Sequence, residues 1–279
     1  MKKFFLFLLI FVFVLSFDSQ AQLKFGIASM ISPEETFILY KDLNDYIAEK
    51  LDMRIETVLK EDYSDMNKLI VNNKVDFALV CTGSFFFLKD NEYELMVTPM
   101  IDGKSTYRSY IIVNNTTGID ELSDLKGKTF AFADRLSNSG SIYPKDVIIK
   151  RFGISHEDFF QKTFYTHSHD KSIYLVNKGV IDGAAVDSLV YDYLAETKPE
   201  EVKNIRIIHK SPYFPAPSIV ASGAIDKKLF DEITQILLKM YQDPKGKKIL
   251  EDLNIDKFIV TDPERFEEIR KMQKLVDDF

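Results

Sequence analysis

The sequence has little cysteine, little histidine and no concentration of positive charge. Cys81 is the single cysteine among 279 residues. No intramolecular disulfide can form, so the fold has to be held by its core, and the chain is long enough for one large core or two smaller ones. Cys81 ends a mostly apolar run that starts at Val75, and this position predicts a buried, unreactive thiol.

The chain lacks the residue patterns that are typical of several enzyme classes. The four histidines are His156, His167, His169 and His209. Their spacing does not suit a metal site, and neither a Walker loop nor a nucleophile elbow occurs. We therefore expect no metal, no cofactor and no catalytic centre.

The charge balance is acidic, with a formal net charge of −7. The sequence contains no basic stripe, so nucleic acid is not an expected partner. Loss of residues 1–21 would remove two positive charges and one negative charge, which gives −8. An acidic protein that binds an anion has to rely on local dipoles and donors, because its overall field repels the ligand.

The first 21 residues have the pattern of a secretory signal peptide. Lys2 and Lys3 precede a run from 4 to 17 that is apolar apart from Ser16, and Ser19 and Ala21 are small residues before a cleavage point. The run is short for a membrane span, although an uncleaved anchor stays an alternative. No cysteine follows the run for lipid attachment, so we expect a soluble monomer in the periplasm.

Strand-like and helix-like segments alternate from residue 23 onwards. A strand over 23–28 is followed by Ser32, Pro33 and Glu35, which match a capping box at the start of a helix. Further strands are predicted over 54–59 and 75–81, with a short helix over 64–72 between them. This order predicts a parallel sheet with helices on both faces.

A second series of the same kind follows, which indicates two lobes. We predict a first lobe over 22–113 plus 217–279 and a second lobe over 114–216, with the chain crossing near Val113 and near Pro217. Ligands of such sheets bind beyond the carboxyl ends of the strands, so a cleft between the lobes would collect both sets of loops.

Two segments between a strand and a helix have the residues of an anion site. Ser137, Ser139 and Gly140 follow the apolar run 130–133, and Ser168 and His169 precede the helix-like run from 173. A helix start leaves backbone N–H groups unpaired and carries partial positive charge, which suits an oxyanion such as phosphate. One such segment is more often a simple helix cap, but two together favour an anion site.

Other side chains are candidates by position. Tyr107 and Ser109 share one face of a strand predicted over 107–113. Tyr63 begins a helix, where its aromatic ring could either line the cleft or pack over the hydrophobic core. Asp187 follows the strand 183–186 and faces the cleft, where it would have to accept a ligand proton or bond the other lobe. We expect His167 to lie outside the site.

These segments resemble the periplasmic solute-binding proteins of phosphate, phosphite and phosphonate ABC importers. The resemblance covers most of the chain and rests on Asp62-Tyr63, Val75-Asp76-Phe77-Ala78, Tyr107-Arg108-Ser109, Leu125-Lys126-Gly127-Lys128, Ser137-Asn138-Ser139-Gly140, Ser168-His169-Asp170, Gly179-Val180-Ile181-Asp182 and Ser211-Pro212. It implies an α/β, two-lobed type II periplasmic-binding-protein fold, in which each lobe is a mixed, mostly parallel sheet flanked by helices. It also implies a phosphorus oxyanion ligand and an ABC permease partner. The ligand-binding residues that it implies are Ser137, Asn138, Ser139, His169, Tyr63 and Tyr107.

The chain departs from that family at two points. Asn138 stands in place of a threonine, and Ala216-Pro217 stands where binders of aminoalkylphosphonates carry an acid. These departures favour phosphate, phosphite or a small alkylphosphonate over a ligand with an amino group. Two other functions stay open: a sensor input to a membrane receptor or histidine kinase, and a phosphatase-like enzyme on the same fold.

Overall fold

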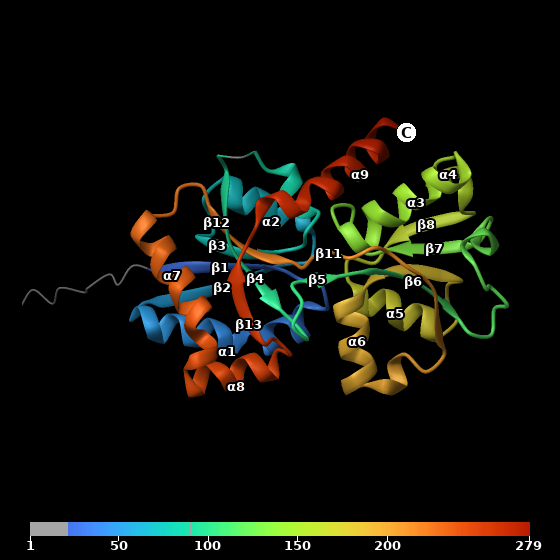
Figure 1. The fold of residues 1–279 in the computed structure, drawn as a ribbon. Helices are drawn as coiled ribbons and strands as arrows, with labels where there is room; N and C mark the ends of the chain where they lie inside the picture. The colour runs from blue at the N-terminus through green and yellow to red at the C-terminus, as the bar shows by residue number, and fades with distance from the viewer. Residues whose placement is uncertain (1–21, 90) are drawn as a thin grey trace, which may run out of the picture.

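A computed structural model describes residues 22–89 and 91–279, and the predicted signal peptide over 1–21 lies outside the described residues. Two sheets lie side by side, with helices packed on both of them (Figure 1). The first sheet has the order β13-β4-β12-β3-β1-β2, and its strands are β1 (Gln22–Ala28), β2 (Arg54–Lys60), β3 (Phe77–Val80), β4 (Tyr93–Met100), β12 (Ser218–Ser222) and β13 (Lys257–Val260). The second has the order β10-β6-β9-β7-β8, and its strands are β6 (Ser109–Asn114), β7 (Thr129–Phe132), β8 (Lys162–Tyr165), β9 (Gly183–Asp187) and β10 (Ile205–Lys210).

Each sheet is covered by its own helices, as the alternating pattern predicts. Those packed with the first sheet are α1 (Pro33–Leu51), α2 (Tyr63–Val71), α7 (Lys227–Lys239) and α8 (Pro244–Asp252). Those of the second are α3 (Tyr143–Phe152), α4 (His156–Phe159), α5 (His169–Asn177) and α6 (Ser188–Thr197). Helix α1 starts at Pro33 as expected, but the side chain of Ser32 makes no capping hydrogen bond, so the predicted capping box does not form.

The two sheets are mixed, but parallel pairs do not predominate as expected. In the first sheet β1 pairs in parallel with β2 and β3, while the pairs that involve β12 and β13 are antiparallel. In the second sheet β7 is parallel to β8 and β9, and β6 is antiparallel to both of its neighbours. The reason is that β6 and β12 carry the chain into a lobe from the other lobe. They therefore begin at the edge of the sheet where β1, β3, β7 and β9 end.

The first crossing between the lobes lies earlier than predicted. The strand predicted over 107–113 is broken at Arg108 into β5 (Thr106–Tyr107) and β6, and β6 pairs within the second sheet. Strand β5 pairs with β11 (Phe214–Pro215) in a separate two-stranded sheet between the lobes. We therefore place the first crossing at β5 rather than near Val113, and the second at β11, close to the predicted Pro217.

The C-terminal helix α9 (Glu267–Asp278) reaches across to the second lobe, whereas the sequence predicts its residues in the first lobe. It follows β13 and the single turn Pro263–Phe266, and it packs on α3 (Figure 1). Its apolar side chains Ile269 and Met272 are buried in a core that also contains Phe132 and Val147 of the second lobe. The helix therefore ties the two lobes together.

The burial of the single cysteine agrees with the sequence, and the helices add a second finding. Cys81 is a free, fully buried cysteine, and burial raises the pKa of its thiol to about 11, so it stays protonated. None of the helices in the described part of the chain is both long enough and apolar enough to cross a membrane.

Candidate functional site

The segment from Ser137 to Gly140 forms a tight, fully buried turn at the end of β7. Ser137 caps the π-helical turn Asn138–Ile142 that leads into α3, and its Oγ accepts the N–H of Gly140 at 3.0 Å. Only glycine fits at position 140, because an added Cβ would lie 2.5 Å from the Cβ of Ala133 and 2.9 Å from Cε1 of His169. The glycine therefore lets the imidazole of the second segment pack directly against the first.

His169 is the first residue of α5, and its ring has one free nitrogen. Nδ1 accepts the backbone N–H of Asp187 at 3.1 Å, so in the neutral ring the proton is on Nε2. Burial lowers the pKa of His169 to about 4, which keeps the ring neutral at pH 7. Nε2 is buried without a hydrogen-bond partner among the described residues. The ring thus presents an unused N–H donor in the interior.

Asp187 ends β9 and caps α6, and it too has one free atom. Its Oδ1 accepts the N–H of Leu189 at 2.7 Å, while Oδ2 is buried and has no partner in the described part of the chain. Burial raises the pKa of Asp187 to about 7, against the opposing effect of the N–H groups of Leu189 and Val190. Near neutral pH the carboxyl therefore keeps its proton for part of the time and can donate a hydrogen bond.

Ser139 and Asn138 add further donors. The Oγ of Ser139 is buried with no partner among the described residues, and its backbone carbonyl accepts a hydrogen bond from Ser109. The Nδ2 of Asn138 donates to the hydroxyl of Tyr107 at 3.1 Å. If the amide turns by 180°, the Tyr107 hydroxyl can donate to Oδ1 instead, which frees the NH2 group for a ligand.

Tyr63 and Tyr107 close the site from the side of the first lobe. Both are about 1 % exposed, and the backbone N–H of Tyr63 donates to Asp134 of the second lobe at 3.2 Å. Burial raises the pKa of both hydroxyls, and Cys81 and Asp187 add to the rise.

The structure thus brings all of the residues predicted for the site into one region. They are Ser137, Asn138, Ser139, His169, Asp187, Tyr107 and, through its contact with Asp134, Tyr63. His167 lies outside this group: its side chain is 45 % exposed and faces Asp134.

One expectation about the second segment is wrong. The start of α5 does not offer its first N–H group to a ligand, because the N–H of His169 donates to the carbonyl of Met30 at 2.9 Å. The Oδ2 of Asp170 accepts the N–H of Ser32 at 3.0 Å. The start of α5 is therefore docked on the first lobe, and its imidazole is what it contributes to the site. These bonds also show that the lobes are closed on each other.

The sequence reasoning missed other buried hydroxyls without a partner among the described residues. They are those of Ser29 and Ser141. Ser29 directly follows β1, so it lies at the edge of the sheet where ligands of such folds bind. A single serine after a strand has no pattern that would distinguish it. Ser168, which the sequence analysis places in the second anion segment, likewise has a buried hydroxyl without a partner in the described part of the chain, and its side chain makes no capping bond.

Replacing either of two serines of the same turn by alanine should affect the unfolding temperature differently. Ser139→Ala removes a buried hydroxyl that has no partner, so the unfolding temperature of the ligand-free protein should stay the same or rise slightly. Ser137→Ala removes a helix-capping bond worth about 1 kcal/mol, and should lower the unfolding temperature by roughly 2–4 °C. Calorimetry on both variants checks this. An equal fall in the unfolding temperature of the two variants would contradict the observation that the Ser139 hydroxyl has no hydrogen-bond partner among the described residues.

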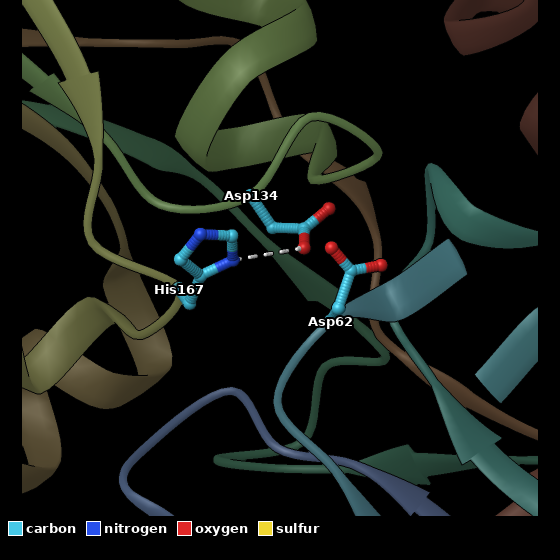
Figure 2. A group of neighbouring side chains, drawn as sticks. All are labelled: Asp62, Asp134 and His167. Atoms are coloured by element: carbon cyan, nitrogen blue, oxygen red, sulfur yellow. Dashed lines mark ion pairs between the residues drawn. The ribbon is translucent and has the colours of Figure 1, made fainter. Parts of the chain in front are cut away.

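A group of side chains across the lobe boundary could hold a metal ion. Asp62 of the first lobe points towards Asp134, with His167 on the other side of Asp134 (Figure 2). Nδ1 of His167 lies 3.9 Å from Oδ2 of Asp134, and one ligand atom from each of the three lies within 4.8 Å of the others. An imidazole and two carboxylates are donors that zinc accepts. Three separate segments supply them, so the spacing of histidines along the chain could not indicate the group, and the expected absence of a metal stays a prediction.

Both carboxylates of this group already have structural roles. Asp134 accepts the N–H groups of Tyr63 and Leu136, and burial raises its pKa, with the charge of Asp62 adding to the rise. Asp62 caps α2, and although burial alone would raise its pKa, the hydrogen bonds from Ser64 and Asp65 lower it. Asp62 therefore carries a full negative charge at neutral pH, and it lies next to the carboxyl of Asp134, whose raised pKa disfavours a negative charge.

Comparison with known proteins identifies a family and related folds. The family model for the periplasmic substrate-binding protein of phosphonate ABC transporters matches residues 25–266. The chain is 27% identical over 242 residues to the phosphonates-binding periplasmic protein of Escherichia coli (strain K12), a match that covers 85% of this chain and 71% of that protein. It is 24% identical over 185 residues to the probable ABC transporter phosphite binding protein PhnD1 of Prochlorococcus marinus (strain MIT 9301), with coverage of 61% and 62%.

Solved structures share the two-lobed fold. A binding protein component of an ABC phosphonate transporter from Pseudomonas aeruginosa superposes with a TM-score of 0.86 at 22% identity, covering 92% of this chain and 87% of that one. PhnD1 from Prochlorococcus marinus, in complex with methylphosphonate, superposes with a TM-score of 0.82 at 18% identity, covering 92% and 99%. The type II periplasmic-binding-protein fold expected from the sequence is therefore confirmed.

Proposed function

The chain belongs to the family of periplasmic substrate-binding proteins of phosphonate ABC transporters, and from this premise we propose which ligand it binds and how. We propose that it captures phosphate, phosphite or a small alkylphosphonate between its lobes and delivers it to a membrane permease. The named relatives bind phosphonates and phosphite, which supports a phosphorus oxyanion as the ligand class.

One observation carries the proposal. The buried side-chain atoms that lack a partner among the described residues include Nε2 of His169, Oγ of Ser139 and Oδ2 of Asp187. Buried polar groups are almost always paired, because an unpaired one costs roughly 1–3 kcal/mol. A tetrahedral oxyanion offers several acceptor oxygens, and it would pair these donors at once.

In the proposed complex the two lobes have different roles. Ser137, Asn138 and Ser139 surround the oxyanion from the turn before α3, and His169 donates from Nε2. Asp187 donates while its carboxyl is protonated. Tyr63 and Tyr107 cover the ligand from the first lobe and from the crossing strand.

We propose binding without turnover. A hydrolytic serine needs a base within hydrogen-bonding distance, and in the described residues neither Ser139 Oγ nor His169 Nε2 has a partner. Residues 1–21 would direct export and be removed after Ala21, and the mature protein would act as a monomer without nucleic acid.

A ligand panel tests the ligand class. A ligand that binds only the folded protein adds about 2.7 kcal/mol of stability at a hundredfold excess over its Kd. For a chain of this size the unfolding temperature should then rise by roughly 5–10 °C. We expect this rise with phosphate, phosphite or methylphosphonate, measured by thermal shift.

Sulfate and amino acids serve as controls and should give little change, because sulfate carries no hydroxyl at neutral pH that could donate to the buried acceptor oxygens of the site, and amino acids lack the tetrahedral oxyanion. Equal shifts for every anion would reduce the effect to general screening and contradict the proposal.

A further inference from the structure

Asp62, Asp134 and His167 meet at the boundary between the lobes and supply none of the proposed oxyanion donors (Figure 2). Asp62 precedes α2 in the first lobe, whereas Asp134 follows β7 and His167 follows β8 in the second. One ligand atom from each side chain lies within 4.8 Å of the others. Opening of the lobes would carry Asp62 away from the other two, so the group of three is complete only in the closed protein.

No lysine or arginine balances the two carboxylates. Within the described ranges neither Asp62 nor Asp134 forms an ion pair with either type of side chain, and Asp134 has only Nδ1 of His167 at 3.9 Å. Arg135 follows Asp134 in the chain, but its guanidinium lies over the ring of Tyr165, 4.5 Å from the ring centre. Closure therefore brings two acidic groups and an imidazole together and leaves the balancing positive charge to come from solution.

Each of the three side chains can bind a metal and keep the bonds that it already makes. The capping bonds of α2 all go to Oδ1 of Asp62, so Oδ2 is available. Oδ2 of Asp134 accepts the N–H of Tyr63 at 3.2 Å, and a carboxylate oxygen has a second lone pair. The side chain of His167 is 45 % exposed, so its ring has room to turn towards the carboxylates.

The donor set favours zinc over calcium and magnesium. Zinc accepts imidazole nitrogen and carboxylate oxygen at about 2.0–2.2 Å in a tetrahedral arrangement, in which ligand atoms lie roughly 3.3 Å apart. Because the three atoms already lie within 4.8 Å of one another, each pair has to approach by at most about 1.5 Å. Small rotations of Asp62 and His167, which lie partly in solvent, supply that movement, and water can take the fourth position. Calcium and magnesium prefer oxygen ligands alone.

We propose that Asp62, Asp134 and His167 form a zinc site that bridges the two lobes and stabilises the closed protein. Two carboxylates that repel each other without a metal are both attracted to Zn²⁺. Because zinc and the oxyanion would both favour the closed form, each should raise the affinity for the other. The zinc site goes beyond the proposed function and departs from the expectation, drawn from histidine spacing, that the protein holds no metal. The coupling to the oxyanion rests on the proposed function.

Titration of the chelator-treated protein with zinc chloride tests the site. We expect one zinc per chain. Asp62→Asn should weaken zinc binding at least tenfold, because even removal of a contact that only supports a metal ligand typically costs about 10- to 100-fold. Asparagine still caps α2, so the variant keeps its fold. Asp65→Asn changes an exposed aspartate one turn further along α2, and as the matched control it should change the zinc Kd less than about threefold. Equal losses in the two variants, or calcium binding as tight as zinc binding, would overturn the site.

Methylphosphonate binding tests the bridge. The Kd should fall at least about fivefold when excess zinc replaces EDTA, which is the low end of the coupling between two sites in proteins. His167→Asn removes the imidazole, and asparagine tolerates the left-handed backbone at this position, where φ is 61°. In this variant zinc should leave the Kd unchanged. The comparison also corrects for zinc that methylphosphonate itself takes up in solution.

The outcomes separate the zinc site from the proposed function. If methylphosphonate binds with the same Kd with and without zinc, the metal does not bridge the closed lobes and the proposal is wrong. If no phosphorus compound binds, the proposed function fails, and small-angle scattering then decides on the bridge. Zinc should lower the radius of gyration of the unchanged protein but not that of His167→Asn, and an equal change in both would overturn the proposal.

Discussion

Phosphonate binding should weaken about fiftyfold between pH 7 and pH 9 relative to binding by an Asp187→Asn variant. Oδ2 of Asp187 can donate to the ligand only while the carboxyl is protonated, and burial raises its pKa to about 7. Above that pH the carboxyl of Asp187 has to take up a proton when the ligand binds, so the affinity falls by up to tenfold per pH unit. In the variant, the side-chain amide donates from its NH2 group at every pH and can still cap α6 through its oxygen.

The measurement is a set of Kd values from pH 6 to pH 9 for both proteins with the same ligand. The ligand's own ionisation affects both proteins equally, so the ratio of the two Kd values isolates the side chain. Asp158→Asn, at an exposed aspartate of α4, should follow the unchanged protein. Parallel curves for the unchanged protein and Asp187→Asn would show that Asp187 does not donate to the ligand.

Ser139→Ala and His169→Ala should each weaken binding of phosphite or methylphosphonate by about 10- to 150-fold. Each side chain has one buried donor atom free for the ligand. A hydrogen bond to a charged oxygen is worth roughly 1.5–3 kcal/mol, and every 1.4 kcal/mol is tenfold in Kd. Titration calorimetry on the two variants measures the loss.

His167→Ala is the matched histidine control and should change the affinity less than threefold. Its ring is nearly half exposed and lies 3.9 Å from Asp134, and contacts of that kind contribute little. If His167→Ala costs as much as His169→Ala, the wrong histidine has been assigned to the oxyanion. If neither Ser139→Ala nor His169→Ala weakens binding, the site lies elsewhere.

Local patterns in the sequence were sufficient to place the main elements and the turn before α3. The run 130–133 followed by Ser137 and Gly140 predicts a strand, a cap and a helix, and the structure has them at those residues. The motif around His169 predicts its proximity to that turn, and the contact with Gly140 shows it. In both cases neighbouring residues along the chain decide the local structure.

Features that depend on how distant segments meet could not be predicted in the same way. The direction of β6 and β12 follows from where the chain re-enters each lobe, and the packing of α9 on α3 depends on a surface formed by other segments. The bond from the N–H of Asp187 to Nδ1 of His169, which determines the ring tautomer, joins residues 18 positions apart. No pattern in the sequence indicates such a bond.

The pair Asp62 and Asp134 has a consequence for release of the ligand from between the lobes. A carrier has to reopen beside its permease, and an interface made only of attractive contacts would resist that. The N–H of Tyr63 holds Asp134 across the boundary, while the charge of Asp62 is brought within about 5 Å of it when the lobes meet. Two unit charges at that separation repel by roughly 1–3 kcal/mol near a protein surface. Whenever both carboxyls are ionised, this repulsion opposes the closed arrangement of the lobes and favours reopening.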